Sequence, residues 1–335
     1  MFFGRQVVTS LRIFQIRACS SVASTSKTIR VPELKKLIQS SSSLRLLDAS
    51  YSIPPFSNKP EEENRRMVFK ERNLYGKVDE LAKLWANADY EKEHIPGAVH
   101  FNSDVATFPG EFTKQDLYEP EIFQKYARKL GINQKSDIIV YSRGAFGGML
   151  FAARTWWLLK VYGAERVRVL EGGLPKWKEQ GEAVTDAITI VEPGNFVARE
   201  PSRNIHVSFE ELFSETNSDG KKHNLLDARP KPQFTGAEPP VFPRNGAPGA
   251  HLEGAKNLPL SLLTNDGELK SAEELSKVFD AAGVSSGKDN ITFCNVGFQA
   301  SLLGLALAKS GRSFRVFNGS LLEVSQRKPS LISAK

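Results

Sequence analysis

Short apolar runs alternate with longer amphipathic stretches along most of the chain. In the clearest case, residues 291–293 predict a buried strand and residues 299–309, rich in leucine and alanine, predict a helix. Short strands that alternate with helices are typical of a mainly parallel sheet with helices on both faces. The pattern therefore predicts an α/β fold.

The same succession of motifs occurs twice, which indicates a duplicated unit. We expect two tandem domains of similar fold, residues 28–180 and 206–335. The joining segment 181–205 lacks a helical period and contains prolines. The paired motifs are Leu46-Leu47-Asp48-Ala49 with Leu225-Leu226-Asp227-Ala228, His94-Ile95-Pro96-Gly97-Ala98 with His251-Leu252-Glu253-Gly254-Ala255, Ile138-Ile139-Val140-Tyr141-Ser142 with Asn290-Ile291-Thr292-Phe293-Cys294, and Val167-Arg168-Val169-Leu170-Glu171-Gly172-Gly173 with Phe314-Arg315-Val316-Phe317-Asn318-Gly319-Ser320.

Helix ends are marked by local signals. Ser271 followed by Glu274 forms a capping-box pattern, and Gly283 is placed to end that helix. A second helix is expected over residues 121–130, before Gly131.

Two polar stretches predict loops. The charged segment 59–66 is expected to be solvated surface. The Pro/Gly-rich segment 236–250 carries Arg244 and is either an ordinary surface loop or a lid over a substrate.

The first 27 residues differ in composition from the rest. They contain no Asp or Glu, are rich in Ser and Thr, and place apolar residues between arginines, as a mitochondrial presequence does. The chain has a formal charge of +7, and four of the positive charges lie in residues 1–27, so the remainder would carry +3. That charge is too small and scattered to indicate nucleic-acid binding. No apolar run approaches the roughly 20 residues of a membrane-spanning helix. We expect a mitochondrial protein, or a cytoplasmic one if the presequence is not used.

Only two cysteines are present, and the expected cleavage would remove Cys19. Cys294 would then be the single cysteine, which excludes disulfide frameworks, paired-cysteine redox motifs and cysteine-based zinc sites. The five histidines show no metal-ligand spacing, so no metal is expected. A thiol between a strand's carboxyl end and a helix N-terminus meets backbone N–H groups that favour the nucleophilic thiolate. The alternative is an ordinary buried core cysteine.

The motifs taken together resemble the two-domain rhodanese family, and within it the mercaptopyruvate sulfurtransferases. The resemblance covers nearly everything after residue 27. Besides the repeat motifs and the cysteine loop, it rests on Arg154-Thr155-Trp156-Trp157-Leu158-Leu159 and Leu170-Glu171-Gly172-Gly173-Leu174-Pro175-Lys176-Trp177. In that family only the second domain carries the catalytic cysteine, and here the first half has Ser142 at the position of Cys294.

The resemblance implies a sulfurtransferase with Cys294 as its nucleophile. A thiolate would take sulfur from 3-mercaptopyruvate or thiosulfate, and the resulting cysteine persulfide would pass it to a thiol or cyanide. Thioredoxin or a small thiol would be the acceptor. The loop N–H groups would stabilise the negative sulfur. No metal or organic cofactor, nucleic acid or membrane is implied.

The cysteine loop departs from the family pattern, which commonly has a basic residue or Gly-Ser after the cysteine and then Gly-Val-Thr. Asn295 and Val296 supply neither a cation nor a hydroxyl, Gly297 is kept, and Phe298 and Gln299 replace Val-Thr. The resemblance implies that these five residues contact the sulfur donor.

Family members that use mercaptopyruvate hold its carboxylate with two arginines. Arg244 matches the second of them, whereas Gln233 stands at the first. A neutral amide cannot reproduce a bidentate, charge-assisted contact to a carboxylate. An altered donor preference follows.

Two other functions are alternatives. A catalytically weak or inactive homologue could persist as a binding or scaffolding protein, and Val296 with Gln233 favours that alternative. A cysteine phosphatase needs an arginine six residues after the cysteine, where this chain has Ala300. The phosphatase is therefore excluded.

Overall fold

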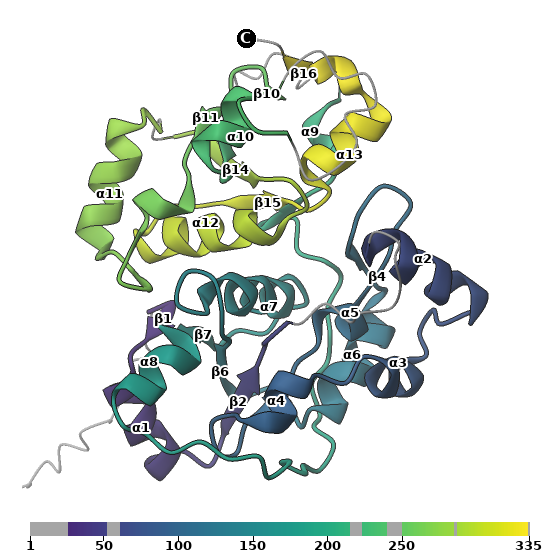
Figure 1. Ribbon diagram of the computed structural model, residues 1–335, viewed down its shortest axis with the longest axis vertical. Coiled ribbons are helices and arrows are strands. Elements are labelled where there is room, and N and C mark those ends of the chain that lie inside the picture. The colour runs from purple at the N-terminus through teal and green to yellow at the C-terminus, as the bar shows by residue number, and fades with distance from the viewer. Residues whose placement is uncertain (1–25, 52–60, 215–222, 240–249, 285–286, 334–335) are drawn as a thin grey trace, which may run out of the picture.

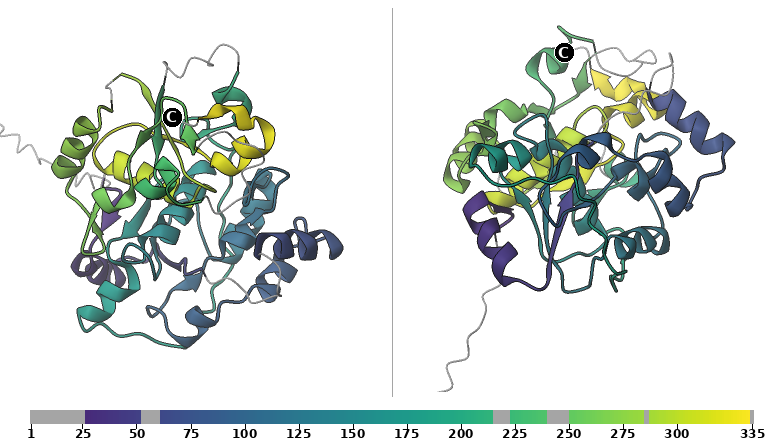
Figure 2. Two further views of the ribbon diagram at one scale, coloured as in Figure 1. Left: turned by 45° about the horizontal axis from the view of Figure 1, so that its top comes forward. Right: turned by 60° about the horizontal axis from the view of Figure 1, so that its bottom comes forward.

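The computed structural model describes residues 26–51, 61–214, 223–239, 250–284 and 287–333, which form two α/β domains, one after the other along the chain. In Figure 1 the first domain lies below and the second above. The left view of Figure 2 shows the same separation of the early, purple-to-teal elements from the late, green-to-yellow ones, whereas in the right view the two domains overlap. The presequence predicted for residues 1–27 falls almost entirely outside the described residues.

Each domain is built on a five-stranded sheet whose paired strands are all parallel. The first sheet has the order β1-β7-β6-β2-β3. The second has the order β11-β9-β14-β15-β8. When β1, β7, β6, β2 and β3 are matched with β8, β15, β14, β9 and β11, the two sheets have the same order. The strands are β1 (Thr28–Ile29), β2 (Leu44–Asp48), β3 (Val99–His100), β6 (Asp137–Tyr141), β7 (Val167–Leu170), β8 (His206–Val207), β9 (His223–Asp227), β11 (Lys256–Asn257), β14 (Asp289–Phe293) and β15 (Arg315–Phe317).

Helices cover both faces of each sheet, which confirms the predicted fold class. On the first sheet, α1 and α8 cover one face and α3, α5, α6 and α7 the other. On the second, α9 and α13 cover the outer face and α11 and α12 the inner one. The bounds are α1 (Val31–Ser40), α3 (Val78–Leu84), α5 (Ser103–Ala106), α6 (Pro120–Lys129), α7 (Met149–Val161), α8 (Gly173–Glu179), α9 (Phe209–Leu212), α11 (Ala272–Ala281), α12 (Phe298–Lys309) and α13 (Ser320–Arg327).

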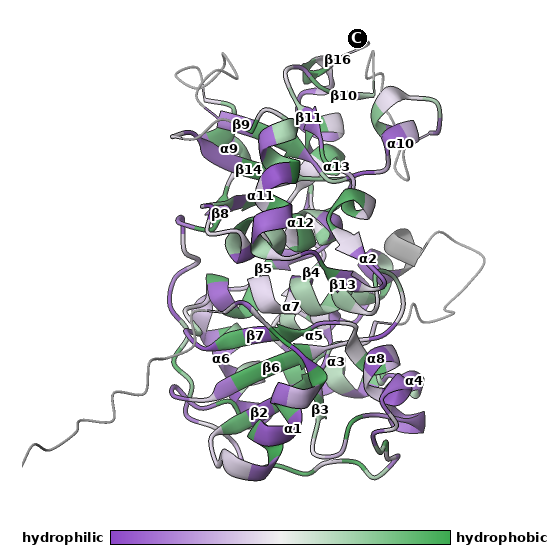
Figure 3. Ribbon diagram, turned by 90° about the vertical axis from the view of Figure 1, so that its left-hand side faces the viewer, coloured by the Kyte–Doolittle hydropathy of each residue, from purple (hydrophilic) through white to green (hydrophobic). Residues whose placement is uncertain are grey.

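The two domains meet through α7 and α12, which face each other between the sheets (Figure 3). Both helices are apolar around nearly their whole circumference, as expected for helices buried on all sides. Gly304 on α12 leaves room for Phe314, because a Cβ there would lie 2.6 Å from the Phe314 ring. Phe314 in turn stacks on Trp156 of α7, with ring centroids 5.7 Å apart. One hydrophobic core thus runs through both domains.

Shorter elements complete the fold. They are α2 (Glu61–Glu71), α4 (Ala88–Lys92), α10 (Lys231–Thr235), β4 (Thr107–Phe108), β5 (Asp116–Leu117), β10 (His251–Leu252), β12 (Thr264–Asn265), β13 (Glu268–Leu269), β16 (Ile332–Ser333) and the 3-10 turns η2 (Leu260–Leu262) and η3 (Pro329–Leu331). No helix within these described stretches is long and apolar enough to cross a bilayer.

Local predictions are confirmed at the helix ends and wrong at one loop. Ser271 and Glu274 form the predicted capping box, with each side chain accepting the other's backbone N–H. The charged segment 59–66 is not a solvated loop, since from Glu61 onward it belongs to α2. Arg65 of that helix is buried and pairs with Asp104 at 3.1 Å, so tertiary packing, not local composition, decides its conformation.

The segment between the domains forms no helix and lies along the first domain. The Gly194 N–H donates to the Arg128 carbonyl at 2.7 Å, and the Phe196 N–H donates to that of Ile132 at 3.1 Å. Phe196 is buried there. These contacts hold the connection against the first domain before the chain enters β8.

Candidate active site

Cys294 lies at the carboxyl end of β14, the central strand of the second sheet. β9 and β15 pair with β14 on either side, so the residue after the strand is held at the middle of the sheet edge. Only Asn295 and Val296 separate Cys294 from Gly297, the N-cap of α12. Gly297 has a φ of +94°, which a glycine adopts without the strain of other residues. The tight turn therefore points the thiol at the start of a twelve-residue helix.

The sulfur atom accepts a backbone hydrogen bond at that helix N-terminus. The Gly297 N–H donates to Cys294 Sγ across 3.1 Å. This donor and the positive end of the helix dipole both favour negative charge on sulfur. Cys294 is nevertheless only 1% exposed and packs against the central core. The residue thus combines the burial of a core cysteine with the surroundings of an activated one.

The first turn of α13, which follows β15, holds the cysteine loop in place. The Cys294 N–H donates to Ser320 Oγ at 3.2 Å, and the Leu321 N–H donates to the Cys294 carbonyl at 3.1 Å. The Leu322 N–H donates to the Asn295 carbonyl at 3.0 Å. Ser320 itself has a φ of +52°, the left-handed region that serine rarely adopts. Its hydroxyl is thereby positioned beneath the cysteine.

Two residues predicted to contact the donor meet each other. Asn295 Nδ2 donates to Gln233 Oε1 at 2.9 Å, which brings α10 against the cysteine loop. Asn295 Oδ1 is buried and has no hydrogen-bond partner in the described part of the chain. A free acceptor in a buried place is costly unless something else occupies it. Arg244, the other predicted carboxylate contact, lies outside the described residues.

The remaining loop residues face in different directions. Phe298 is buried against the first domain, with its ring 5.9 Å from Tyr51 and 5.7 Å from Phe151 between centroids. Val296 and Gln299 are partly buried. Phe298 is therefore part of the domain interface.

A buried polar group from the first domain also reaches this loop. Arg154 of α7 and Asn318 both bond to Gln115, the arginine through Nη2 at 3.3 Å and the asparagine through Nδ2 at 2.8 Å, each to the Gln115 carbonyl. A Cβ on Gly297 would lie 3.3 Å from Arg154 Nη1 and 2.8 Å from the Asn318 carbonyl oxygen. These residues are not among those that the sequence predicts to take part in the site. The available signal was a lone arginine inside the apolar run of residues 149–159.

A model of the rhodanese-like domain matches this chain twice, over residues 79–180 and 210–327. The chain belongs to the rhodanese family. The family suspected from the sequence is thereby confirmed, in both halves of the molecule.

Relatives of this rhodanese chain carry sulfurtransferase names. The Caenorhabditis elegans protein mpst-1, provisionally named a thiosulfate sulfurtransferase, is 34% identical over 312 residues, which cover 90% of this chain and 93% of that protein. The Escherichia coli 3-mercaptopyruvate sulfurtransferase is 35% identical over 221 residues, 66% of this chain and 75% of that enzyme. A structure of the yeast mitochondrial complex I sub-stoichiometric sulfur transferase subunit superposes with a TM-score of 0.71 at 27% identity, covering 92% of this chain and all of that one.

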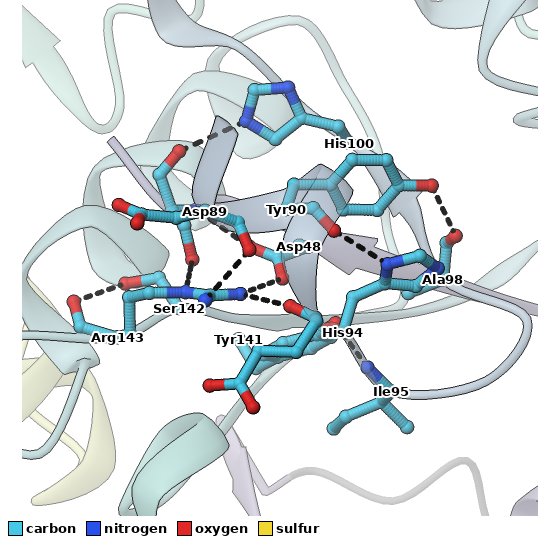
Figure 4. A network of polar contacts seen from close by, with 12 residues as sticks. Asp48, Asp89, Tyr90, His94, Ile95, Ala98, His100, Tyr141, Ser142 and Arg143 are labelled. Carbon is cyan, nitrogen blue, oxygen red and sulfur yellow. Dashed lines mark hydrogen bonds and ion pairs between the residues drawn. The ribbon is translucent and has the colours of Figure 1, made fainter. Parts of the chain in front are cut away.

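In the first rhodanese domain, an arginine occupies the position that corresponds to Asn295 (Figure 4). Arg143, which follows Ser142, donates to Asp48 at 3.1 Å, to Ser50 Oγ at 2.8 Å and to the Asp89 carbonyl at 2.9 Å. The Ser142 hydroxyl donates to the Gly148 carbonyl at 2.6 Å and is fully buried. Neither side chain is left free for chemistry.

In the second rhodanese domain, the equivalent aspartate, Asp227, pairs with an arginine from a different position. Arg229, two residues beyond Asp227, places its Nε 3.0 Å from the carboxylate and its Nη2 2.6 Å from it. Both side chains are buried. Because Arg229 supplies the cation, the residue after the cysteine need not be basic.

The repeated histidines have equivalent structural contacts. The His94 ring stacks on Tyr90 at 4.1 Å and the His251 ring on Phe234 at 4.1 Å. In each case Nδ1 also bonds to the carbonyl of that aromatic residue, at 2.7 and 2.9 Å. No cluster of three or more possible metal-ligating His, Cys, Asp or Glu side chains occurs in the part of the chain that the structure describes.

Proposed function

We propose that this protein is a sulfurtransferase that carries sulfane sulfur as a persulfide on Cys294. The observation that supports it most is the placement of Cys294 Sγ, 3.1 Å from the Gly297 N–H at the N-terminus of α12. A thiolate is the nucleophile in sulfur transfer, and this placement favours it. The sulfurtransferase names of the relatives point to the same chemistry.

The transfer balances without a cofactor. With 3-mercaptopyruvate, the Cys294 thiolate attacks the donor's sulfur and the carbon–sulfur bond breaks. Its electron pair stays on carbon, which takes up a proton to give pyruvate, and the thiol hydrogen remains on the new persulfide. With thiosulfate, the sulfur–sulfur bond breaks and sulfite leaves with the electron pair. An acceptor thiolate or cyanide then attacks the outer sulfur and regenerates the Cys294 thiolate.

The donor's carboxylate would lie between α10 and the cysteine loop. Gln233 and Asn295 meet there at 2.9 Å, and Asn295 with Val296 begins the loop that carries the thiol. We assign Gln233, Arg244, Gly297, Phe298 and Gln299 to donor binding as well, Arg244 as the cation for the carboxylate. A single guanidinium can still hold a carboxylate through two hydrogen bonds.

Intact-mass measurement tests the persulfide directly. We expect the Cys19→Ser chain to gain about 32 Da, one sulfur atom, after treatment with 3-mercaptopyruvate or thiosulfate. The Cys19→Ser/Cys294→Ser chain should gain nothing. Cys19→Ser/Ser142→Ala is the matched control, because it alters the equivalent position of the first domain and should load normally. Absence of any loading with every donor would overturn the proposal.

The acceptor is expected to be a thiol, either a small one or a thioredoxin-type protein. Adding acceptor to the loaded protein should return the mass to its starting value. Neither a nucleic acid nor a membrane has a part in this reaction.

A second candidate function is that of a binding or scaffolding subunit with little activity. It is favoured by the 1% exposure of Cys294 and by the similarity to a sulfur transferase that is a subunit of a larger complex. It predicts an unloaded protein that co-purifies in a stable assembly. The mass experiment separates the two functions.

We also place the protein in mitochondria. The acid-free N-terminal 27 residues support this location, and so does the mitochondrial origin of the yeast neighbour. N-terminal sequencing of the endogenous protein should find a start near residues 18–28. A start at Met1 or Phe2 would contradict import with cleavage.

A further inference from the structure

Arg154 is a fully buried arginine on α7, in the interface between the two domains. Its Nε lies 3.4 Å from Gln115 Oε1, and its Cζ lies 4.6 Å from the centre of the Trp157 ring. Its remaining terminal nitrogen, Nη1, is buried and has no hydrogen-bond partner among the residues that the structure describes. Proteins seldom leave a charged donor in this state, because a buried charge is costly unless it is paired.

The unpaired nitrogen points at the cysteine loop. It lies 3.3 Å from the place that a Cβ on Gly297 would take, and Gly297 is the residue whose N–H binds Cys294 Sγ. The guanidinium carbon also lies 5.5 Å from the centre of the Phe298 ring, the first residue of α12. The first domain thus presents a cation to the start of the second domain's helix.

No carboxylate neutralises this cation at ion-pair distance within the described ranges. Burial lowers the pKa of Arg154 to about 9, and the Cys294 sulfur is the largest influence opposing that change, ahead of Asp116. A guanidinium with that pKa is still charged at neutral pH. The negative charge that best completes the arrangement is therefore a thiolate or a persulfide on Cys294.

We propose that Arg154 is the counter-cation of the Cys294 thiolate, and of the persulfide formed on it, supplied by the first domain to the reaction centre of the second. The part of this inference that concerns the persulfide rests on the proposed function, whereas the part that concerns the thiolate does not. It gives Arg154 an electrostatic positioning role. It also explains how a loop with Asn295 and Val296 in place of a cation or hydroxyl can stabilise charge on sulfur.

Other titratable and charged groups face Arg154 from the neighbouring elements. Asp116 of β5 and Tyr162 at the end of α7 act on it, and Arg154 in turn acts on His206 of β8. Lys114 adds a second cation near Phe298, with its Nζ 5.9 Å from the ring centre. Asp116 is the competing anion, so the test must follow the cysteine itself.

The test is the pH dependence of the ultraviolet absorbance of the Cys294 thiolate, taken as the difference from Cys294→Ser in a Cys19→Ser background. We expect Arg154→Met to move the midpoint upward by about 1 pH unit or more, because an opposite charge no longer favours the anion. Arg154→Lys should stay close to the parent protein. Arg168→Met is the matched control, since that first-domain arginine pairs with Asp137 at 2.9 Å instead.

Persulfide formation provides the second readout. At neutral pH we expect Arg154→Met to load about tenfold more slowly, in proportion to its lost thiolate, and to approach the parent rate at high pH. A purely structural role would lower the rate equally at every pH. If Arg154→Met does not fold, the NMR signals of the Arg154 guanidinium should still follow the titration in the parent protein and not in Cys294→Ser.

The outcomes separate the two proposals. If the parent protein loads sulfur and Arg154→Met titrates at the same pH, the counter-cation inference is wrong and the sulfurtransferase stands. If no donor loads the parent protein but the thiolate midpoint moves in Arg154→Met, the inference stands and the proposed function fails.

Discussion

Each central strand of the two domains neighbours a strand that ends on a buried aspartate paired with an arginine, but the arginine comes from a different position in each half. Asp48 receives Arg143, the residue after Ser142. Asp227 receives Arg229 from its own strand end. Because Arg229 pairs with Asp227, position 295 does not need an arginine. The asparagine at that position donates a hydrogen bond to Gln233 instead. A local charge requirement is met in both halves, but only in the first half does the residue after the Ser142/Cys294 position supply the arginine.

Moving the arginine should therefore show strong coupling between positions 229 and 295. Arg229→Ser alone leaves Asp227 buried without its cation and should destabilise the protein by about 3–5 kcal/mol. Adding Asn295→Arg recreates the arrangement of the first domain. We expect the double variant to recover at least 1 kcal/mol relative to the sum of the single variants, within the roughly 0.5–3 kcal/mol typical of coupled neighbours. Urea unfolding measures all three, and additive values would contradict the equivalence.

Donor preference should change at Gln233. An introduced guanidinium would lie near Asn295, whose Oδ1 has no partner within the described ranges, and would be placed to bind a donor carboxylate. A charge-assisted contact contributes about 1.5–3 kcal/mol, or one to two decades in affinity. Gln233→Arg should thus raise kcat/KM for 3-mercaptopyruvate by about tenfold or more, and Arg244→Ala should lower it at least as much.

Thiosulfate is the control donor for that pair, because it has no carboxylate and should respond less to either substitution. An unchanged or reduced rate with 3-mercaptopyruvate in Gln233→Arg would mean that the pocket accepts an uncharged donor. Val296 and Phe298 would then form an apolar wall.

The turn between strand and helix decides how each domain uses its central strand. Five residues, 143–147, separate Ser142 from the N-cap Gly148, whereas only Asn295 and Val296 separate Cys294 from Gly297. The shorter turn brings the thiol within hydrogen-bond distance of the helix N-terminus. In the longer turn the serine hydroxyl bonds to the Gly148 carbonyl instead. The two turns thus differ in one contact: the backbone N–H at the helix start donates to the Cys294 side chain, whereas the Ser142 side chain donates to a carbonyl.

Ser320, at the start of α13 beside the cysteine loop, has a strained backbone, and the hydrogen bond that its hydroxyl accepts offsets that strain. Ser320→Ala keeps a positive φ that alanine tolerates poorly and loses the hydroxyl that accepts the Cys294 N–H. We expect a loss of about 1–2 kcal/mol in the free energy of unfolding. Ser320→Gly loses the same hydrogen bond but relieves the backbone, so its loss should be smaller. Denaturant titrations decide this, and a glycine variant less stable than the alanine variant would refute it.

Contacts between the domains hold the whole molecule together. Glu171 of the first domain is buried and pairs with Lys309 of the second, as well as with Arg30 at 3.4 Å. Trp157 Nε1 donates to the Ile205 carbonyl at 2.9 Å, where the chain enters the second domain. With the shared core around α7 and α12, these contacts keep Arg154 against the cysteine loop. They also make the two rhodanese domains depend on each other for stability.

His206 lies at this junction and should make stability depend on pH. Its ring is 6.1 Å from that of Trp157, and burial, with a smaller effect of Arg315, lowers the pKa of His206 to about 4. An unfolded histidine titrates near about 6.5, so the unfolded chain binds more protons between these values. Stability should therefore fall as the pH is lowered from about 6.5 towards 4, by on the order of 2 kcal/mol for this group.

Comparison with His206→Gln isolates the effect of this imidazole. Urea unfolding of the variant should show a shallower loss of stability over the same pH range, and the two proteins should run parallel above it. Equal slopes at low pH would mean that His206 is not the group responsible.

Much of the fold could be predicted from local patterns. Strand and helix periodicity, the capping box at Ser271 and the repeated motifs are written in residues close together in the chain, and local hydrogen bonding with burial of one face is enough to specify them. The repeat also placed Cys294 and Ser142 at equivalent positions. That equivalence is visible in the matching strand orders of the two sheets.

The partners of the site came only from the tertiary structure. Arg154 lies 140 positions before Cys294, and nothing near either residue in sequence states that α7 packs against α12. The direction of a buried side chain depends on how two sheets and the helices between them fill a common core. The same reason applies to Ser320 beneath the cysteine, to Arg229 in place of a basic loop residue, and to the burial of Arg65 in a segment predicted to be solvated. Composition and spacing specify which elements form, whereas the close packing of the two domains decides which charges meet.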